Sequence, residues 1–287
     1  MNILCSVNER LIRQYKCMVY SLAESQNEPV DLFFVNLSLT EYQLNNLKKY
    51  TEALHIKFHE LNFPEALIKK IQNARKDQLE ILNRTFSMEC YVRVFAHLIL
   101  PKEMTRVLWI DADCIVQKNI IKLYDYNLFD NIGFATVDCY ELDPRQHDYV
   151  LNSIKKPMGL TEEDTMFNSG VLLLNLKRIR ELEEFREENL IKLLSEKPEL
   201  NFDQDILNYL CKGRIIINKD LIFNYPPNWS TYDDIVNNMH KKSILHYYGV
   251  HKPWLETSST PSIGIQPWKK YDKMSRILDD LIGTKYI

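Results

Sequence analysis

Glycine is scarce in this chain of 287 residues. There are 7 glycines, and the first is Gly133. The GxGxxG dinucleotide fingerprint and the Walker phosphate loop both need closely spaced glycines. Residues 1–132 therefore contain neither motif, and glycine-rich backbone cannot hold the phosphates of a nucleotide bound in that part of the chain.

Long apolar runs and paired cysteines are also missing. No run of about 18 apolar residues occurs, so we expect no transmembrane helix. The apolar stretch in the opening MNILCSVNER is too short for a signal peptide. No two of the six cysteines have CxxC spacing, which argues against a zinc site or a redox pair. We expect a cytoplasmic protein whose contact with the inner face of the membrane is peripheral at most.

Neither sign of charge dominates the sequence. The chain has 36 Lys and Arg against 39 Asp and Glu, and its net charge is −3. A nucleic-acid-binding domain would be basic, so no nucleic acid is expected as a partner. An apolar content of 45% is ordinary for a soluble globular protein. We predict one catalytic domain over 1–255 and, over 256–287, a helical C-terminal extension of that domain.

Strand and helix patterns alternate in the first half. The helix at 38–54 opens with Ser38 and Glu41 in capping-box spacing, and Ser87 is the expected N-cap of another helix. This alternation predicts an α/β fold with a mostly parallel sheet between layers of helices. Strands are expected at 2–7, 29–37, 55–61 and 106–110, and helices at 11–25, 38–54, 65–83 and 87–100.

The second half is less regular. A polar segment, 139–165, separates two predicted strands and contains no readable chemistry. Strands are expected at 132–138, 168–176, 214–218 and 243–249, and helices at 176–196, 203–213 and 267–287.

Two aspartates, Asp111 and Asp113, follow the buried strand 106–110. Adjacent carboxylates at the edge of a core repel each other and are costly to desolvate unless a cation pairs with them. A bend at Ala112 would bring both to one ion, and oxygen ligands suit Mn²⁺ or Mg²⁺. The alternative is an ordinary pair of surface acids, since the same D-x-D spacing recurs at Asp203 and Asp205.

The C-terminal third adds His246, Gly249 and Lys252 in the segment LHYYGVHKPW. They would supply a third metal ligand, a close approach of the backbone and a cation for phosphate. A hydrogen-bonded core histidine and a solvated lysine are the structural alternatives.

At this point a family resemblance becomes specific. The chain resembles the family 8 retaining glycosyltransferases from residue 2 to about 254. Five blocks in the same order carry the resemblance: CYVRVFAHLILP, RVLWIDADCIV, MFNSGVLLLNLKR, FDQDILNYLCKGR and LHYYGVHKPW.

The resemblance implies a GT-A fold, a Rossmann-like mixed sheet flanked by helices. It implies transfer of glucose or galactose from a UDP-sugar to a hydroxyl of a glycan or lipopolysaccharide-type acceptor, with the anomeric configuration retained. The matching positions make Asp111, Asp113 and His246 the ligands of Mn²⁺ or Mg²⁺. Gly249 and Lys252 match diphosphate contacts of the family.

The resemblance also assigns residues to the donor sugar. They are Arg93 and Asn168, with Asp203 on the sugar hydroxyls and Gln204 nearest the reacting carbon. Asp138, at a strand end, is a further candidate for a sugar hydroxyl, and Ala112 and Ser169 are the remaining candidates for substrate binding.

Ordinary structural roles compete with several of these assignments. Arg93 has Glu89 at i−4, where an ion pair within a helix is expected. Asp203 stands where a helix N-cap is expected. Asn168 could be a turn residue, and Asp138 an exposed acid at a strand end.

The chain departs from the family after its first strand, where Asn8 and Glu9 stand in place of the usual aspartates. An amide both donates and accepts, so Asn8 remains the candidate for binding uracil. The altered segment keeps open a non-catalytic nucleotide-sugar binder. A sugar-nucleotide pyrophosphorylase is less favoured because it would need an early glycine-rich loop. The sequence does not identify the acceptor.

Overall fold

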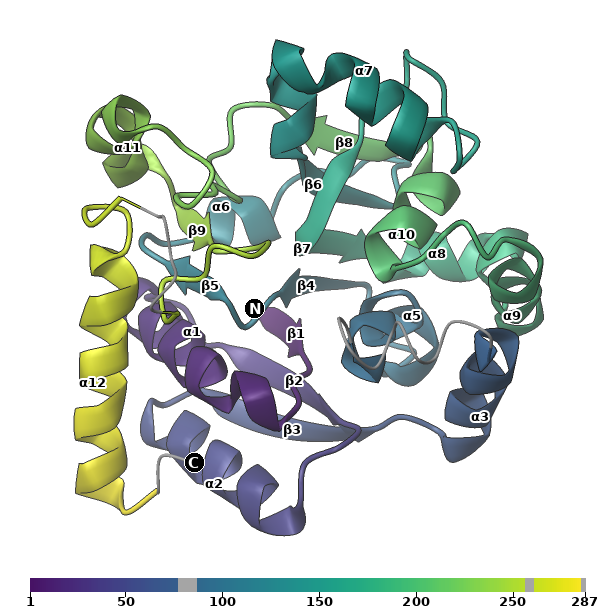
Figure 1. The fold of residues 1–287 in the computed structure, drawn as a ribbon. Coiled ribbons are helices and arrows are strands. Elements are labelled where there is room, and N and C mark those ends of the chain that lie inside the picture. Colours follow the sequence, from purple (N-terminus) through teal and green to yellow (C-terminus); the bar gives the residue numbers. More distant parts are fainter. Residues whose placement is uncertain (77–86, 256–260, 285–287) are drawn as a thin grey trace. The chain divides into compact units, whose positions relative to one another are not determined.

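The computed structural model describes residues 1–76, 87–255 and 261–284 (Figure 1). The chain forms two compact units. The terminal unit comprises Met1–Glu60, Leu108–Tyr126 and Asp220–Ile287, and the central unit comprises Leu61–Val107 and Asn127–Lys219. The fold class is the predicted one, a mixed and mostly parallel seven-stranded sheet flanked by helices. The predicted division at residue 255 stays a prediction.

The terminal unit begins with parallel strands in the order β3-β2-β1-β4. Strand β1 pairs in parallel with both β2 and β4, as the alternation of strands and helices predicts. The bounds are β1 Asn2–Cys5, β2 Asp31–Asn36, β3 Lys57–Asn62 and β4 Arg106–Ile110.

A second sheet in the terminal unit has only two strands. Strand β5 (Cys114–Val116) pairs antiparallel with β9 (Ile244–His246). Cys114 lies directly opposite His246 in this pairing. The short ladder therefore brings the region after β4 next to a segment about 130 residues further along the chain.

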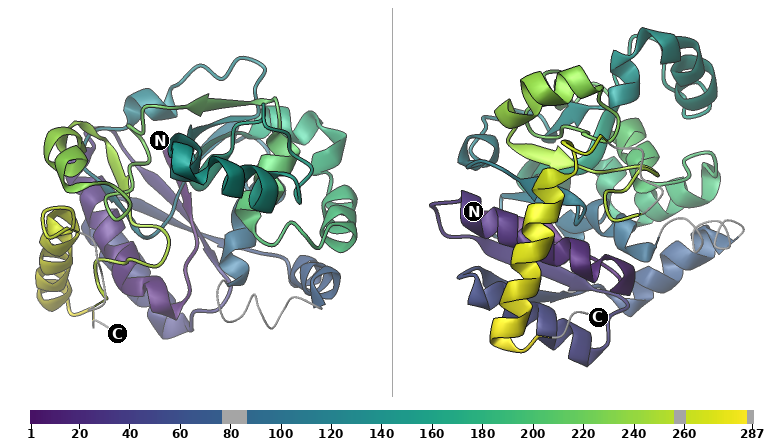
Figure 2. Two further views of the ribbon diagram at one scale, coloured as in Figure 1. Left: turned by 45° about the horizontal axis from the view of Figure 1, so that its top comes forward. Right: turned by 60° about the vertical axis from the view of Figure 1, so that its left-hand side comes forward.

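Helices pack around these strands. Helix α12 runs along α1 and α2 (Figures 1 and 2). Its Trp268 and Tyr271 enter a buried cluster with Cys17 of α1 and Tyr247. The bounds are α1 Ile12–Ser25, α2 Glu41–Ala53, α6 Ile121–Tyr124, α11 Tyr232–Asn238 and α12 Gln266–Ile282, with 3₁₀ helices at Glu9–Leu11 and Met239–Lys241.

In the described part of the central unit, the sheet strands lie in the order β7-β6-β8. Strand β6 (Gly133–Val137) is antiparallel to β7 (Phe167–Asn175) and parallel to β8 (Ile215–Asn218). Its α-helices are α3 Glu65–Ala74, α5 Ala96–Ile99, α7 His147–Tyr149, α8 Leu176–Glu181, α9 Glu187–Glu196 and α10 Asp203–Cys211.

The described residues of this unit also form shorter helical turns. They are the 3₁₀ helices Met88–Arg93, Cys139–Leu142, Pro144–Gln146 and Glu183–Phe185, and the π-helix Val150–Lys155.

The predicted capping box of α2 was placed two residues too early. Thr40 is the N-cap, its side chain accepts from the Gln43 backbone N–H, and Gln43 Oε1 accepts from the Thr40 N–H. Ser38 and Glu41 have the same spacing, so two overlapping boxes compete in the sequence. The structure selects the second.

Two predicted helices are interrupted. The helix expected at 87–100 is a 3₁₀ turn (Met88–Arg93) followed by α5, with Ser87 at the predicted N-cap position. Every residue from 89 to 97 is buried, so tertiary packing overrides local helix propensity there.

The helix expected at 176–196 breaks between α8 and α9. Phe185 lies in this break, is buried, and its carbonyl accepts from His97 Nε2 at 2.7 Å. The predicted helix at 65–83 begins as expected with α3, and its residues 77–83 lie outside the described part of the chain.

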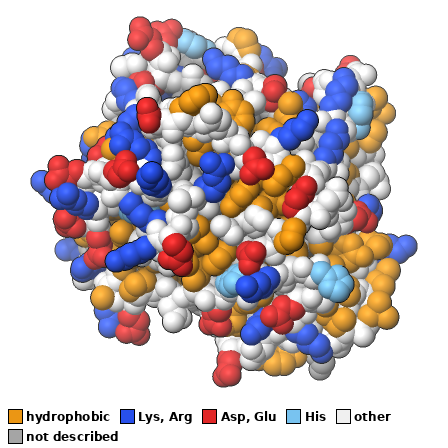
Figure 3. All heavy atoms as spheres, turned by 180° about the vertical axis from the view of Figure 1, so that it is seen from behind, with side chains coloured by type: hydrophobic (Ala, Val, Ile, Leu, Met, Phe, Trp, Pro, Cys, Tyr) orange, Lys and Arg blue, Asp and Glu red, His pale blue; other side chains and the backbone are white. Residues whose placement is uncertain are grey.

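Among the described residues, no helix is long and apolar enough to cross a membrane. Lys and Arg side chains are interspersed with Asp and Glu side chains on the face drawn in Figure 3. The predicted cytoplasmic location and any peripheral membrane contact stay predictions.

Ion pairs join α12 to α1, and two of them involve buried or partly buried side chains. Lys16 Nζ lies 2.6 Å from Asp279 Oδ1, and both side chains are at most 3% exposed. Arg13 contacts both carboxylate oxygens of Asp272, at 2.5 and 2.6 Å. The Tyr50 hydroxyl of α2 bonds Ser275 at 2.7 Å. The terminal unit therefore includes the C-terminal helix as part of its core.

We expect Asp279→Ala to lower the free energy of unfolding by about 3–5 kcal/mol, because it removes the carboxylate that lies 2.6 Å from the buried Lys16 ammonium. Urea titration measures the loss. Lys270→Ala is the matched control, since its pair with Glu24 is largely exposed, and we expect a change below about 1 kcal/mol. Equal effects of the two substitutions would contradict the role given to the Lys16–Asp279 pair.

Candidate active site

The predicted site residues fall into two groups, one in each unit. The carboxylate–imidazole cluster of the terminal unit comprises Asp111, Asp113, His246 and Lys252. The buried polar cluster of the central unit comprises Arg93, Asp138, Asn168, Ser169, Asp203 and Gln204.

Strand pairing positions the carboxylate–imidazole cluster. Strand β4 ends at Ile110, as predicted, and the chain turns through residues 111–113 before β5 begins. The Cys114 N–H donates to the Asp111 carbonyl at 3.1 Å, and the Tyr247 N–H donates to the Asp113 carbonyl at 3.0 Å. These bonds close the turn, and they fix the segment after β9 beside it.

The imidazole of His246 faces both predicted carboxylates. Its Nε2 lies 3.1 Å from Asp113 Oδ1 and 3.7 Å from Asp111 Oδ2. Its Nδ1 lies 2.9 Å from Asn224 Oδ1. A carbonyl oxygen only accepts, so Nδ1 donates to Asn224, and Nε2 is the ring nitrogen that faces the carboxylates.

Further contacts hold the two carboxylates. Trp109 Nε1 donates to Asp111 Oδ1 at 2.8 Å. Lys252 Nζ donates to Asp113 Oδ2 at 2.5 Å and to the Tyr247 carbonyl at 2.7 Å. Burial alone would raise the pKa of Asp113, but the charges of Lys252 and His246 outweigh it and hold that pKa well below its usual value. Asp113 is therefore an ionised carboxylate.

The donor atoms of this cluster fit a divalent cation. Ligand atoms of Asp113, Cys114 and His246 lie within 4.8 Å of one another. Burial raises the pKa of the Cys114 thiol, which keeps it protonated and makes it a poor ligand for a hard ion. Asp111, 3.7 Å from His246 Nε2, is then the better third ligand. The assignment of Asp111, Asp113 and His246 as metal ligands stays a prediction.

Gly249 has a structural reason to be glycine. Its φ is +76°, and a Cβ there would lie 2.9 Å from the Trp229 ring. Asn8 also has a local role, because its Oδ1 accepts from the Arg10 N–H at 3.0 Å. Ala112 is buried in the turn between the two aspartates. Their predicted roles toward a donor stay predictions.

Arg93 organises the buried polar cluster of the central unit. Its Nη1 donates to the Ser169 carbonyl at 2.9 Å, and its Nε lies 3.1 Å from Asp203 Oδ2. Ser169 Oγ donates to the same Asp203 oxygen at 2.9 Å. The 3₁₀ turn of Arg93, strand β7 and helix α10 are thus joined through one buried carboxylate.

Gln204 bridges two other predicted residues. Its Oε1 accepts from the Ser169 N–H at 3.1 Å, and its Nε2 donates to Asp138 Oδ2 at 3.0 Å. Burial raises the pKa of Asp138, partly offset by hydrogen bonds from the Tyr140 N–H, Gln204 and Asn168. Both ends of the Gln204 amide are therefore oriented by the protein.

Comparison with known proteins identifies the family of the chain. The family described as "Glycosyl transferase family 8" matches residues 2–258. The chain belongs to this family. The predicted GT-A fold and glycosyltransferase activity are thereby confirmed.

Individual relatives are distant in sequence. A lipopolysaccharide 1,2-glucosyltransferase of Escherichia coli is 26% identical over 264 residues, covering 82% of this chain and 75% of that protein. The galactosyltransferase LgtC, solved with donor and acceptor sugar analogues, has a TM-score of 0.73 at 18% identity, with 99% and 100% of the two chains covered. GlyE of Streptococcus pneumoniae has a TM-score of 0.67 at 21% identity, covering 100% of this chain and 64% of that one.

Two structural alternatives considered for this family 8 enzyme are wrong. Asp203 is not the N-cap of α10, because Phe202 occupies that position and Asp203 is the first helical residue. Asp205 serves the helix end instead, since its Oδ2 accepts from the Asn201 N–H at 3.1 Å. Asp203 is thus free of a capping role and turns inward to Arg93 and Ser169. Nor is Asp138 an exposed acid, since it is 5% exposed.

The sequence prediction missed several supporting residues of this glycosyltransferase. Asn224 and Trp109 orient His246 and Asp111. Asn208 is buried one turn after Gln204, accepts from the Phe167 N–H and donates to its carbonyl, both at 2.9 Å. Two of these residues could have been found from their spacing to a predicted site residue. Trp109 lies two residues before Asp111, and Asn208 lies four residues after Gln204. Asn224 had no such signal.

We expect Asn224→Ala to weaken Mn²⁺ binding by roughly 10–100-fold, because His246 loses the acceptor that fixes its tautomer. Electron paramagnetic resonance of free Mn²⁺ measures the affinity without any turnover. Asn224→Asp restores an acceptor and should retain most of the affinity. Asn237→Ala, at an exposed site on α11, is the matched control. Unchanged affinity in Asn224→Ala would contradict the proposed orientation of His246.

Proposed function

We propose that this family 8 enzyme is a metal-dependent, retaining hexosyltransferase. It moves glucose or galactose from a UDP-sugar to a hydroxyl of a glycan or lipopolysaccharide-type acceptor. The observation that carries the proposal is His246 Nε2 facing the Asp111 and Asp113 carboxylates, at 3.7 and 3.1 Å. The glucosyl- and galactosyltransferases similar to the chain support a hexose as the transferred sugar.

Asp111, Asp113 and His246 would hold Mn²⁺ or Mg²⁺. The ion supplies positive charge that offsets the charge developing on the departing diphosphate. Lys252, beside Asp113, adds an ammonium group to the same region, and the tight turn at Gly249 leads to it. In this proposal both contact the diphosphate, and Asn8 binds uracil.

The buried polar cluster would bind the donor sugar. Arg93, Asp138 and Asn168 offer the charged and amide groups that recognise hydroxyls, and Ser169 and Ala112 complete the set. Asp203 would accept from sugar hydroxyls. The close hydrogen bonding among these side chains supports a preorganised site, in which little rearrangement is needed when the sugar binds.

Retention of configuration requires either two displacements or attack on the face that the leaving group vacates. Gln204 is a neutral amide and a poor nucleophile, and Asp203 is engaged by Arg93 and Ser169. We therefore favour same-face attack. The bond from C1 to the diphosphate oxygen breaks with its electron pair on oxygen. The acceptor oxygen then bonds C1, and its proton passes to a diphosphate oxygen.

Metal removal tests the first part of the proposal. We expect EDTA to abolish both the hydrolysis of the UDP-sugar and the transfer of its sugar to an acceptor. Excess Mn²⁺ should restore both activities. Asp113→Asn should lose at least 100-fold in kcat/KM, which is about 2.7 kcal/mol. Asp280→Asn, exposed on α12, is the matched control and should turn over normally. Full activity in EDTA would rule out the metal role.

Product configuration tests the second part. We expect an α-linked product from a UDP-α-sugar, read from the anomeric proton coupling by NMR. Gln204→Ala should slow turnover without abolishing it, because Gln204 would stabilise positive charge and form no bond. A β-linked product would contradict retention. A sugar trapped covalently on Gln204 or Asp203 would contradict same-face attack alone.

A further inference from the structure

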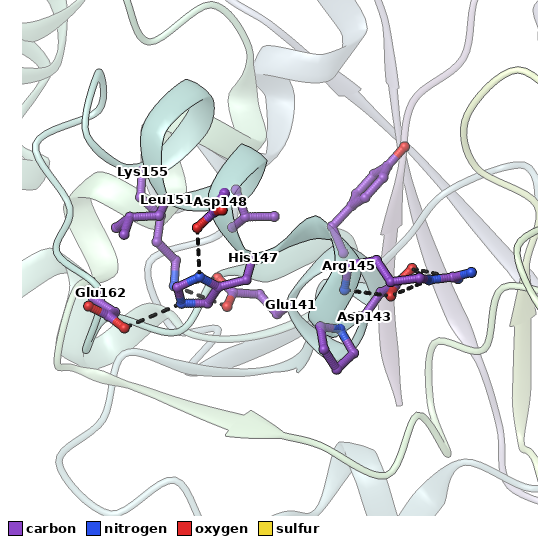
Figure 4. Close-up of a pocket in the computed structure, with 11 residues that line it drawn as sticks. Glu141, Asp143, Arg145, His147, Asp148, Leu151, Lys155 and Glu162 are labelled. Atoms are coloured by element: carbon purple, nitrogen blue, oxygen red, sulfur yellow. Dashed lines mark hydrogen bonds and ion pairs between the residues drawn. The ribbon is translucent and has the colours of Figure 1, made fainter.

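The polar segment between β6 and β7 encloses a cavity of about 540 Å³ (Figure 4). Its wall is built entirely from residues between Tyr140 and Glu162, all within the central unit. We call it the 140–162 pocket. Its volume is within the range of small-molecule sites, roughly 300–1,000 Å³. None of the proposed donor residues lines it.

The pocket is held in shape by its own polar contacts. Lys155 is buried and lies 2.8 Å from Glu141 Oε1, and the same oxygen accepts from the Met166 N–H at 3.0 Å. Asp143 accepts from the backbone N–H of Arg145 at 3.0 Å. The wall is therefore hydrogen-bonded to Met166, the residue just before β7.

The lining combines groups that recognise sugars. Tyr140 supplies an aromatic side chain, and Val150 and Leu151 supply aliphatic surface. His147 lies between two carboxylates, with Nδ1 3.4 Å from Asp148 and Nε2 3.3 Å from Glu162 (Figure 4). Asp148 and Glu162 are largely exposed, so their remaining lone pairs can accept from hydroxyl or ammonium groups.

The charges of the lining limit what it binds. Four carboxylates line the pocket, against two side chains that are cationic at neutral pH, Arg145 and Lys155. Each of these cations pairs with a carboxylate of the wall. Even a protonated His147 would leave an excess of negative charge. Phosphorylated or carboxylated ligands are therefore disfavoured, and neutral or amino sugars are favoured.

The wall begins at a residue of the proposed donor site. Asp138 Oδ1 accepts from the Tyr140 N–H at 3.1 Å, and Asp138 Oδ2 accepts from Gln204 at 3.0 Å. The Asp138 carboxylate thus holds both the Gln204 amide and the first turn of the pocket wall in place. The pocket wall and Gln204 therefore share one hydrogen-bonding partner, Asp138.

We propose that the 140–162 pocket binds the part of the carbohydrate acceptor remote from the reacting hydroxyl, and that it selects neutral or amino sugars over anionic ones. This inference rests on the proposed function for its role in transfer. Glycan binding itself requires neither donor nor metal.

A glycan array carrying neutral, amino, phosphorylated and carboxylated sugars tests the proposal, with calorimetry on the glycans that bind. We expect the bound glycans to be neutral or amino sugars. The charge reversal Asp148→Lys with Glu162→Lys should weaken their binding at least tenfold. The control pair Asp130→Lys with Glu163→Lys has the same charge change on exposed residues outside the pocket, and should bind within twofold of the parent.

A second variant, Leu151→Trp, fills the cavity without changing charge and should weaken binding as well. Hydrolysis of the UDP-sugar without acceptor should persist in all variants. Hits confined to anionic glycans, no hits at all, or parental binding by both pocket variants would overturn the proposal. A parent that binds such glycans but hydrolyses no UDP-sugar would contradict the proposed function and support the pocket.

Discussion

The terminal unit depends on the charge balance around Asp113. This carboxylate is only 14% exposed at its side chain, yet its pKa lies below the usual value. A buried ionised group is tolerated only when cations and hydrogen bonds replace its water. His246 and Lys252 supply them from positions 133 and 139 residues further along the chain. The β5–β9 ladder makes this possible because it places Cys114 opposite His246.

The central unit also contains a buried carboxylate with partners from other elements, that of Asp203. Arg93 and Ser169 satisfy this buried carboxylate from two other elements, and the Ser169 backbone N–H binds Gln204. Removing either partner would take a contact from this buried carboxylate, so the geometry of Gln204 is tied to the stability of the unit. In the proposed same-face transfer, this network would hold the neutral amide of Gln204 in a fixed position.

Some features were predictable from sequence because they depend on neighbouring residues or on motifs that follow one another in a fixed order. The buried run 106–110 followed by Asp111 and Asp113 predicted an acidic strand end, and the later His246 and Lys252 were predicted as a metal ligand and a phosphate contact. The capping box was misplaced because Ser38–Glu41 and Thr40–Gln43 have identical spacing. The helix 87–100 was predicted whole because nothing local shows that Arg93 must reach Asp203. Asn224 was missed because its partner is 22 residues away.

The central claim is that the carboxylate–imidazole cluster binds the metal of the donor complex. Crystals soaked with Mn²⁺ and UDP, measured for anomalous scattering from manganese, test it directly. The account predicts one strong peak coordinated by Asp111, Asp113 and His246 Nε2, with the diphosphate of UDP also bound to it. Bound UDP with no peak at these three side chains, or with a peak elsewhere, would contradict it.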